Sequence, residues 1–396
     1  MPETQSWLKS EFSRYYSEHE VRYPERYGAR EYAFFFFDCA GMIRHTSFMS
    51  TRKLRDFLAY AGPKHAYYSS AFYERPAAQT MGQKNWLGAE LIFDLDADHF
   101  PGTENMIRED MLAMVKGETR KVLDKFVLGD LAFDPKYVGV VFSGGRGYHI
   151  HINDPRVLEL DSHCRKEISD YIGFIDGDID ILMEQKAVRG SGNFKGAYYR
   201  QMPKPDDPGW KGRVAQALTE YVDKLEAMPR KEAIKDIAKR MKTGEGAAAK
   251  VYDPLFSGRS GSRGADILRS RHSIDFLKEY ETHLLCEELV PALMREEAGT
   301  IDAPVTKDVN RLIRLPNSLH GKTGLRVAPI KLEELKDFEP LRDAVAFGDA
   351  PVKIRGLKPD SIRMKGGHFS ITDGTETEVP EYAAVYFAAR GTAQIE

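Results

Sequence analysis

Hydrophobic and polar residues alternate with different periods along the chain, and these periods predict its elements. In the N-terminal half the period is two, which is typical of half-buried strands. Residues 31–50 are rich in aromatic and β-branched side chains, residues 90–98 alternate strictly, and residues 137–153 read as strand, glycine turn and strand. The segments 104–127 and 155–175 have the mixed spacing of helices. We expect an α/β (α+β) unit of short strands and hairpins rather than a regular βαβ array.

The pattern changes to a helical period after the proline-rich segment MPKPDDPGW. Apolar residues then recur every three or four positions, which predicts an inserted helical subdomain at 203–297. Its apolar stripes are formed by Val214, Leu218, Val222, Leu225, Ile234, Ile237, Met241, Ile274, Leu277, Leu284, Leu285 and Leu289. Residues 1–202 and 298–355 would then be two parts of one α/β domain. Strand and turn signals in 356–396 predict a small C-terminal β element.

One loop of the predicted subdomain, residues 256–272, combines positive charge with glycine and serine. Its charged residues are Arg259, Arg263, Asp266, Arg269 and Arg271. A solvated surface loop has this composition, and so does a loop that contacts the phosphates of a nucleic acid. Both interpretations are open at the level of the sequence.

Composition and charge describe an ordinary globular protein. The chain has 396 residues, 42% of them hydrophobic and 30% charged, which suits two or three domains. Its formal net charge is -3, so a polyanionic partner must be bound by local patches of positive charge rather than by a global field. A nucleic-acid function is neither supported nor excluded by this number.

The cysteines and the apolar runs bear on the cellular compartment. Cys39, Cys164 and Cys286 are too widely spaced for a disulfide scaffold, a zinc ribbon or a Cys-ligated iron–sulfur cluster. The N-terminal segment has no apolar signal region, and the longest apolar run, residues 32–37, is far shorter than a membrane-spanning helix. We expect a cytoplasmic protein with no membrane association.

The first candidate for chemistry is the segment ELIFDLDAD. Period-two alternation places Asp94, Asp96 and Asp98 with Ile92 on one face of the strand. Carboxylates on adjacent positions of one face repel each other, and a bound divalent cation is the natural way to keep them ionised. Two such carboxylates suit phosphoryl transfer with magnesium. A strand whose polar face meets solvent would show the same pattern.

The second candidate is the glycine-rich turn SGGRGYHIH. Its glycines allow the backbone to approach an anion, Ser143 can donate a hydrogen bond, and Arg146 adds a charged fork. It is not a dinucleotide fingerprint, because the spacing G-x-G-x-x-G before a helix is absent. His149 and His151 share a strand face, but two histidines without further ligands do not indicate zinc. An ordinary tight hairpin is an equally good interpretation of this segment alone.

The third candidate is the segment 301–325, IDAPVTKDVNRLIRLPNSLHGKTGL. Its charged and histidine side chains are Asp302, Lys307, Asp308, Arg311, Arg314, His320 and Lys322. The letters HGKT do not form a phosphate-binding P-loop, because Pro316 stands where that motif needs glycine. Arg, His and Lys side chains downstream of a metal-binding carboxylate fit the binding of a triphosphate. A surface mixture of charges would look the same if this segment stood alone.

The three segments together closely resemble the catalytic small subunit of archaeal and eukaryotic DNA primases, and the archaeal form in particular. The resemblance is carried by DLD at Asp94–Asp96, by SGGRGYH at Ser143–His149, and by IDAPVT and RLIRLPNSLHGKTGL within Ile301–Leu325. Weaker similarities are MIRHTSF at 42–48 and YERP around Arg75. The resemblance covers roughly residues 10–335.

The resemblance implies a role for each matching residue. Asp94, Asp96 and Asp302 would bind Mg²⁺ or Mn²⁺ as the catalytic carboxylates. The triphosphate of the incoming nucleotide would be bound by Ser143, Arg146, His149, Arg314, His320 and Lys322. Arg44 matches an arginine near the family's active site and is a tentative contact, whereas Asp98 matches no functional position and is expected only to solvate the strand end. No zinc is predicted, because residues 99–136 lack the cysteines of the family's zinc knuckle.

The resemblance also implies a fold and an activity. The fold would be the primase catalytic fold, with mixed, largely antiparallel sheets and the helical subdomain inserted between the second and third motifs. The activity would be template-directed synthesis of short primers on single-stranded DNA during replication, by two-metal nucleotidyl transfer. The primers would be RNA, and the sequence leaves open whether DNA primers are made as well. The implied partner is the primase large subunit in a heterodimer. The alternatives are a primase-polymerase of repair or of a mobile element, and a non-catalytic nucleic-acid-binding scaffold.

Overall fold

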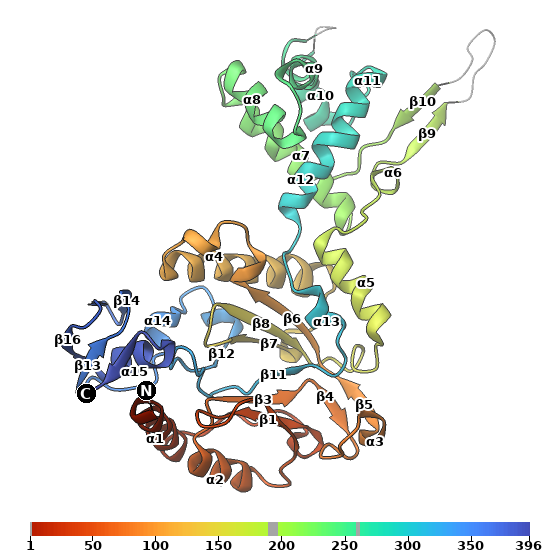
Figure 1. Cartoon of the computed structure of the whole chain (residues 1–396). Coiled ribbons are helices and arrows are strands. Elements are labelled where there is room, and N and C mark those ends of the chain that lie inside the picture. Colours follow the sequence, from red (N-terminus) through yellow and green to blue (C-terminus); the bar gives the residue numbers. More distant parts are fainter. Residues whose placement is uncertain (1, 189–196, 259–261) are drawn as a thin grey trace. The chain divides into compact units, whose positions relative to one another are not determined.

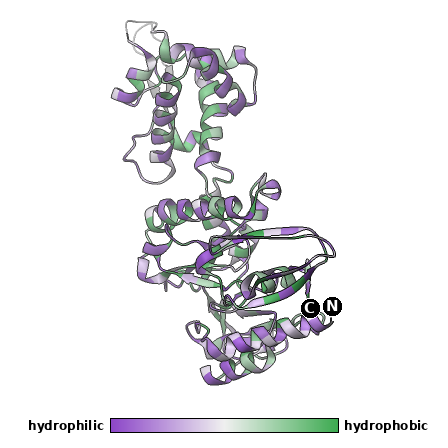
Figure 2. Cartoon of the chain, turned by 90° about the vertical axis from the view of Figure 1, so that its left-hand side faces the viewer, coloured by the Kyte–Doolittle hydropathy of each residue, from purple (hydrophilic) through white to green (hydrophobic). Residues whose placement is uncertain are grey.

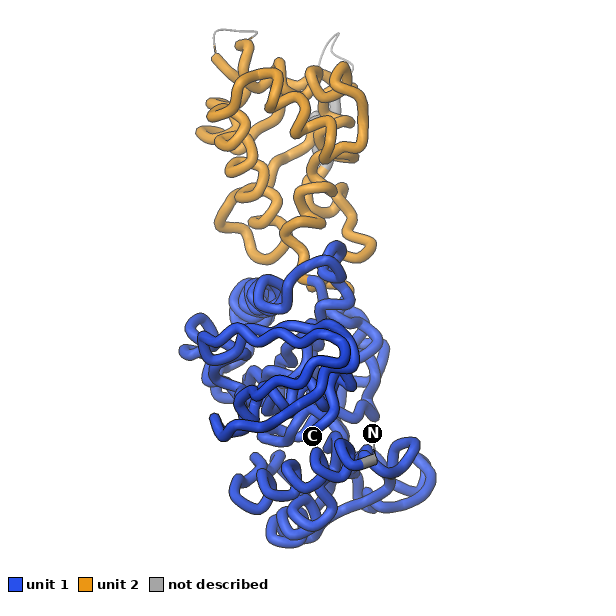
Figure 3. Tube along the Cα trace, turned by 60° about the vertical axis from the view of Figure 1, so that its left-hand side comes forward, with its two compact units in different colours: residues 1–169, 300–396 blue, residues 170–299 orange. Residues whose placement is uncertain are grey.

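The structure is a computed structural model, and it describes residues 2–188, 197–258 and 262–396. The chain folds as two compact units, residues 1–169 with 300–396 and residues 170–299 (Figure 3). The second unit starts ahead of the change of period at 203, because the short helix α6 (Ile179–Leu182) and the hairpin of β9 and β10 precede its long helices. The first unit is built from both ends of the chain.

One antiparallel sheet of the first unit has the order β12–β7–β8–β6. Its strands are Ala328–Ile330, Val138–Phe142, Gly147–Ile152 and Leu91–Asp96. The register sets Asp94 opposite His149 and Asp96 opposite Gly147. Residues directly opposite each other share a sheet face, so the first two motifs lie side by side. The helix α4 (Arg108–Lys121), continued by a π-helical segment Val122–Asp130, packs on β6 and β8.

A second antiparallel sheet has the order β11–β3–β1–β2. Its strands are Leu312–Arg314, His65–Ser69, Tyr32–Phe35 and Ile43–Thr46. The helices α1 (Pro2–Glu18) and α2 (Thr51–Ala61) pack together on the side of this sheet away from β6, β7 and β8 (Figure 1). Ser50 caps α2 by accepting a hydrogen bond from the Lys53 N–H at 3.2 Å. Pairing of β11 with β3 brings the third motif into this sheet.

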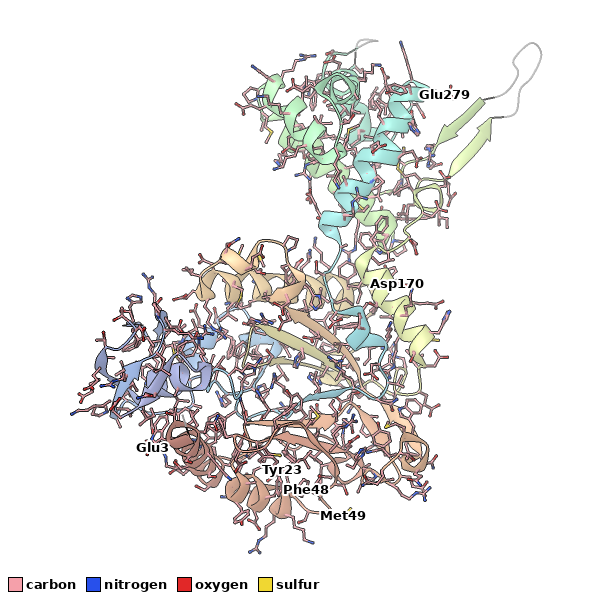
Figure 4. The ribbon with its side chains drawn as sticks, viewed as in Figure 1. Glu3, Tyr23, Phe48, Met49, Asp170 and Glu279 are labelled. Carbon is pink, nitrogen blue, oxygen red and sulfur yellow. The ribbon has the colours of Figure 1, made fainter. Side chains whose placement is uncertain are left out.

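The aromatic run of β1 is explained by the core between this sheet and α2. The rings of Phe34 and Phe57 have centroids 4.8 Å apart, and the rings of Phe48 and Phe57 have centroids 5.4 Å apart. Phe48 is buried whereas its neighbour Met49 is 77% exposed, and both are labelled in Figure 4. The aromatic side chains therefore stabilise the sheet from its outer side and leave the other side for the functional residues.

Short elements complete this part of the first unit. They are β4 (Ala71–Tyr73) and β5 (Trp86–Ala89), which pair antiparallel, α3 (Met81–Lys84), α5 (Ser162–Gly173), which runs across the boundary into the second unit, α13 (Ala303–Lys307) and α14 (Pro340–Asp343). The helix α13 packs on β6. The chain therefore returns from the second unit directly beside the strand that carries Asp94 and Asp96.

The C-terminal segment contains the strands expected from its sequence and one helix that was not expected. The strands are β13 (Pro351–Gly356), β14 (Asp360–Met364), β15 (Gly367–Ile371), β16 (Glu376–Pro380) and β17 (Ala393–Ile395). Residues 381–390 form the helix α15 instead of β structure. The segment YAAVYFAA is rich in alanine, which favours a helix, and it is apolar all round because α1, β13 and β17 enclose it. Gly391 ends the helix with a left-handed φ of 70°.

The second unit is mainly helical. Its elements are α7 (Trp210–Glu226), α8 (Arg230–Met241), α9 (Glu245–Phe256), α10 (Gly264–Arg271), α11 (Glu279–His283), a π-helical segment Leu284–Leu289, α12 (Val290–Glu297), and the hairpin β9 (Gln185–Val188) and β10 (Ala197–Arg200). The helices carry hydrophilic and hydrophobic residues side by side (Figure 2). The apolar stripe of α7 is buried, as its period predicts.

The basic loop of this unit forms ion pairs where the structure describes it. Arg263 pairs with Glu226 and with Asp266, the latter at 2.9 Å. Arg269 pairs with Asp223 at 2.5 Å and with Glu226 at 2.6 Å. Arg259 lies outside the described residues. The charges of Arg263 and Arg269 are therefore balanced within the unit.

The prediction of a mixed α/β fold with antiparallel sheets is confirmed. Every strand pair recorded in the described residues is antiparallel. Within the same residues, no helix combines the length and the apolar character that crossing a membrane requires.

Candidate active site

A cavity of about 470 Å³ in the first unit collects residues from all three motifs. It is lined by β6 and β8 of one sheet and by β3 and β11 of the other. Six of its lining side chains are Arg or Lys and two are Asp: Arg108, Arg146, Arg311, Arg314, Lys322, Arg390, Asp94 and Asp96. The other polar lining side chains are Tyr67, Ser143, His149, His320 and Thr323. A cavity with this excess of positive charge suits an anionic ligand.

The three predicted carboxylates meet at one end of β6. Asp302 follows the helical insertion, and its backbone N–H donates to the Asp94 carbonyl oxygen at 2.8 Å. Asp302 is also 3.5 Å from His99 Nε2 through its Oδ2 atom. The chain thus returns to the strand of Asp94 and Asp96 after an excursion of more than a hundred residues. Proximity of these positions is a result of tertiary structure.

Electrostatic repulsion from the other two carboxylates affects the pKa of Asp94. Burial, and after it the negative charges of Asp96 and Asp302, raise the pKa of Asp94 to about 7. Arg311 and His99 act in the opposite direction but do not outweigh them. Among the described residues, no group of three or more His, Cys, Asp or Glu side chains forms a ready-made metal centre. The cluster is nevertheless one whose charged state a divalent cation would stabilise.

The glycine turn between β7 and β8 is shaped by close packing. Gly144 has a left-handed φ of 74°, and a Cβ atom there would lie 2.7 Å from the His320 Cβ. At Gly147 a Cβ would lie 2.2 Å from the Leu95 carbonyl oxygen. Ser143 Oγ accepts hydrogen bonds from the N–H groups of Gly145 and Gly147, both at 3.3 Å. The absence of side chains at Gly144 and Gly147 therefore allows the second motif to pack closely against the first and the third.

Arg146 forms ion pairs with two carboxylates that follow one another on and after β6. Arg146 Nη2 is 3.2 Å from Asp96 Oδ1 and also pairs with Asp98. The strand ends at Asp96, and residues 97–99 form a short 3-10 helix, which turns the Asp98 carboxylate towards Arg146. Asp98 was expected only to solvate the strand end because it matches no functional position of the family; its side chain is 63% exposed, and it forms in addition the ion pair with Arg146.

The two histidines of the cavity are neutral. Burial lowers the pKa of His149 and of His320 well below the usual value, and Arg314 adds to this effect at both. His149 Nε2 is 3.6 Å from Asp94 Oδ1, and its Nδ1 is buried without a hydrogen-bond partner among the described residues. His320 Nδ1 lies 3.1 Å from Thr323 Oγ1, which in turn donates to the Gly144 carbonyl at 2.7 Å.

Arg314 and Lys322 supply positive charge from the third motif. Arg314 Nη1 is 2.8 Å from His65 Nδ1, and its guanidinium lies 5.1 Å from the centroid of the Tyr67 ring. Burial lowers the pKa of Arg314, and Tyr67 and Asp94 favour its charged form. Lys322 is exposed and lines the cavity. A basic side chain on a strand and one on a turn thus reach the same space.

Arg44 lies elsewhere in the first unit. Its Nε and Nη2 atoms are 3.1 and 3.2 Å from the two carboxylate oxygens of Glu31, and Lys84 Nζ is 2.9 Å from the same carboxylate. Arg44 is not among the residues that line the cavity. Its contact with reacting groups stays a prediction.

Sequence reasoning missed three residues of the cavity wall. Tyr67 lies on β3, Arg108 is the first residue of α4 and Arg390 is the last residue of α15. None of them belongs to one of the three motifs. No local pattern could have found Arg108 and Arg390, because helix termini commonly carry charged residues for reasons unrelated to ligands.

Comparisons with known proteins show which family this chain resembles. The profile of the family described as DNA primase small subunit matches residues 93–332. The chain is 41% identical to the DNA primase small subunit PriS of Methanosarcina acetivorans over 99% of its length and 96% of the relative. It is 39% identical to that of Methanococcoides burtonii over 99% of the chain and 98% of the relative.

A more distant relative has the same extent. The small subunit PriS of Natronomonas pharaonis is 36% identical over 98% of each chain. Full-length similarity at this level confirms the family prediction made from the three motifs. The chain belongs to the family of archaeal DNA primase small subunits, the catalytic nucleotidyltransferase subunits that synthesise primers in DNA replication.

Proposed function

We propose that the 470 Å³ cavity is where this chain transfers nucleotides, and that it makes short RNA primers on a single-stranded DNA template. The observation that carries the proposal is the placement of acidic and basic groups in one space. Asp94, Asp96 and Asp302 come together at the end of β6, and cationic side chains from four separate segments line the cavity that Asp94 and Asp96 also line. This arrangement suits a reaction in which a triphosphate is held and its leaving group is stabilised.

The carboxylates fit a divalent cation, and primases of this family generally use divalent metals. We assign Asp94, Asp96 and Asp302 as the residues that would bind Mg²⁺ or Mn²⁺. The support is the raised pKa of Asp94, which burial and the charges of Asp96 and Asp302 cause together and which a bound cation would counter. When bound, such ions neutralise the charge that develops on the attacking and leaving oxygens. The chain's own contribution is to hold the ligands at the end of β6 and α13.

The proposed phosphate-binding residues line the same cavity as Asp94 and Asp96. Arg146, Arg314 and Lys322 provide charge, and Ser143 orients the glycine turn through its two accepted hydrogen bonds. The neutral His149 and His320 can each donate one hydrogen bond to a phosphate oxygen without adding positive charge. In this role Arg146 would exchange its contacts with Asp96 and Asp98 for contacts with phosphate.

Membership of a small-subunit family implies a large-subunit partner. We propose that the two form a heterodimer and that the large subunit carries the iron–sulfur cluster, since the three cysteines of this chain are separate free thiols. An iron–sulfur cluster usually takes four Cys ligands, and this chain has three cysteines. We propose that primer synthesis by this chain takes place in the cytoplasm.

The decisive experiment is synthesis from labelled nucleoside triphosphates on an unprimed single-stranded DNA template, with Mg²⁺ or Mn²⁺, with and without the large subunit. The Asp96→Ala variant removes a proposed ligand, and Asp56→Ala on α2, where the side chain is 68% exposed, is the matched control. We expect short metal-dependent products with the parent chain and the control, and none with Asp96→Ala.

Other outcomes favour the alternatives. Extension of a supplied primer without synthesis on the unprimed template, even with the large subunit present, would favour a primase-polymerase of repair. Absence of synthesis under both conditions would favour a nucleic-acid-binding scaffold.

A further inference from the structure

Two arginines of the cavity wall come from segments without a proposed role. Arg108 begins α4 and Arg390 ends α15, so they are far apart in the sequence and neither belongs to a motif. Their guanidinium carbons lie 5.7 and 5.3 Å from the centroid of the same ring, that of Tyr386. The buried tyrosine thus serves as a common support for two cationic groups that both line the cavity.

Arg108 is positioned by a hydrogen bond, and it retains a donor that has no partner among the described residues. Its Nη2 donates to the Gly145 carbonyl at 2.8 Å, which ties it to the glycine turn. Its Nε is buried and has no hydrogen-bond partner within the described part of the chain. Burial lowers the pKa of Arg108, and repulsion from Arg390 and Arg146 adds to the effect. A buried N–H group normally has a hydrogen-bond acceptor, so the unsatisfied donor of Arg108 points to a ligand.

Arg390 is held from one side only. Its Nε donates to Asp360 Oδ2 at 2.8 Å, and 37% of its side chain is exposed. The guanidinium fork has further N–H groups, and the residue lines the cavity. Arg390 is therefore oriented by Asp360 and Tyr386 with donors still available to an anion.

The cavity has two ends that differ in charge. The charges that act on Asp94 are those of Asp96, Asp302, Arg311 and His99, which mark the carboxylate end. Arg108 instead contacts the glycine turn and lies close enough to His320 to lower its pKa. Arg108 and Arg390 thus lie beside the glycine turn, and among the described residues neither forms a hydrogen bond or an ion pair with Asp94, Asp96 or Asp302.

We propose that Arg108 and Arg390 form a subsite for the terminal phosphate of the incoming nucleoside triphosphate, through which the site distinguishes triphosphates from diphosphates. The inference rests on the proposed function, in which the reacting α-phosphate lies at the carboxylate end. A terminal phosphate carries about 1.5 to 2 negative charges near neutral pH, whereas a phosphodiester of a template carries one. Two guanidinium groups beside Arg146 match the more highly charged group.

The test compares the equilibrium binding of ATP and ADP by calorimetry in the presence of Mg²⁺. In Arg390→Gln we expect the affinity for ATP to fall about tenfold, as for the loss of a charge-assisted hydrogen bond, and the affinity for ADP to change by less than about twofold. Arg355→Gln is the control, because Arg355 is a C-terminal arginine that pairs with Glu376 and Glu396 and does not line the cavity.

A second variant, Arg108→Gln, should shift the same ratio. Arg108→Gln removes a hydrogen bond to Gly145, so the thermal unfolding of this variant is measured together with its nucleotide affinity. If Arg108→Gln does not fold, the result with Arg390→Gln alone tests the subsite. Equal losses for ATP and ADP, or no loss, would overturn the subsite while leaving primer synthesis by the parent chain intact. A selective loss of affinity for single-stranded DNA would also overturn it and assign the two arginines to the template. Failure of the parent chain to bind either nucleotide would contradict the proposed function itself.

Discussion

Two clusters of charged side chains in the first unit differ in how their charges are paired. In one, the guanidinium of Arg30 pairs with Glu90 and donates to the carbonyls of Ser69 at 2.8 Å and Ser70 at 3.1 Å. In the other, Asp94 lies beside further carboxylates, and the buried Nε of Arg108 has no hydrogen-bond partner among the described residues. In the first cluster each buried charge faces an opposite charge, whereas in the second like charges lie together.

The pKa values express the same difference. Burial by itself raises the pKa of Glu90, but the Arg30 charge and a hydrogen bond from His151 lower it to about 2. The pKa of Asp94 is raised to about 7 because burial and neighbouring carboxylates act together. A charge with internal partners contributes to stability, whereas a charge without them is available to a ligand. Variants at the two clusters should therefore affect different properties.

The largest effect is expected from Asp96→Ala. Loss of a proposed cation ligand should lower primer synthesis by at least about 10³-fold, while the removal of carboxylate repulsion leaves the fold intact. The rate of synthesis and the midpoint of thermal unfolding are measured together. Retained synthesis, or an unfolded variant, would show that Asp96 belongs with the structural charges instead.

Glu90→Gln should have the opposite profile. It leaves Arg30 without its buried partner, which costs about 3–5 kcal/mol of unfolding free energy. Because the folded pKa of about 2 lies below the ordinary value of 4.5 for a glutamate, the stability from Glu90 is present above pH 4.5 and is lost as the pH falls towards 2. The gap between parent and variant in urea unfolding should close over this range. Glu333→Gln, an exposed position, is the control.

Arg146→Ala tests the boundary between the clusters, because Arg146 has carboxylate partners at its present position. If it binds phosphate during the reaction, the affinity for nucleoside triphosphates should fall about tenfold with little change in stability. Nucleotide titration checks the affinity, with Arg52→Ala on the exposed face of α2 as the control. Unchanged nucleotide affinity would leave Arg146 as a partner of Asp96 and Asp98 only.

The smallest effect is expected from Asp94→Asn on stability. A folded pKa raised from 3.8 to about 7 means that the folded protein loses stability as the pH rises from about 4 through 7. The uncharged variant avoids this loss, so its thermal midpoint at pH 8 without divalent cations should be higher by about 2–4 °C. A lower midpoint would indicate that the Asp94 charge already has sufficient partners within the chain.

Particular elements show how far local sequence reaches. The alternation of ELIFDL predicted β6, and SGGRG predicted the turn between β7 and β8, because both depend on neighbouring residues. The helix α15 was missed because its burial on all sides hides the helical period. The ion pair of Asp98 with Arg146 was not predicted, because the strand ends at Asp96 and the pairing depends on the turn that follows.

The sequence by itself determined the elements that carry the motifs, the family and the identity of the candidate site residues, since these depend on residue type and spacing. Tertiary structure alone decided that Asp302 returns to Asp94, that β11 pairs with β3, and that Arg108 and Arg390 meet over Tyr386. The physical reason is that burial and charge act through space. A carboxylate or guanidinium acquires its pKa and its partners from whatever the fold places within a few ångströms, however distant it is along the chain.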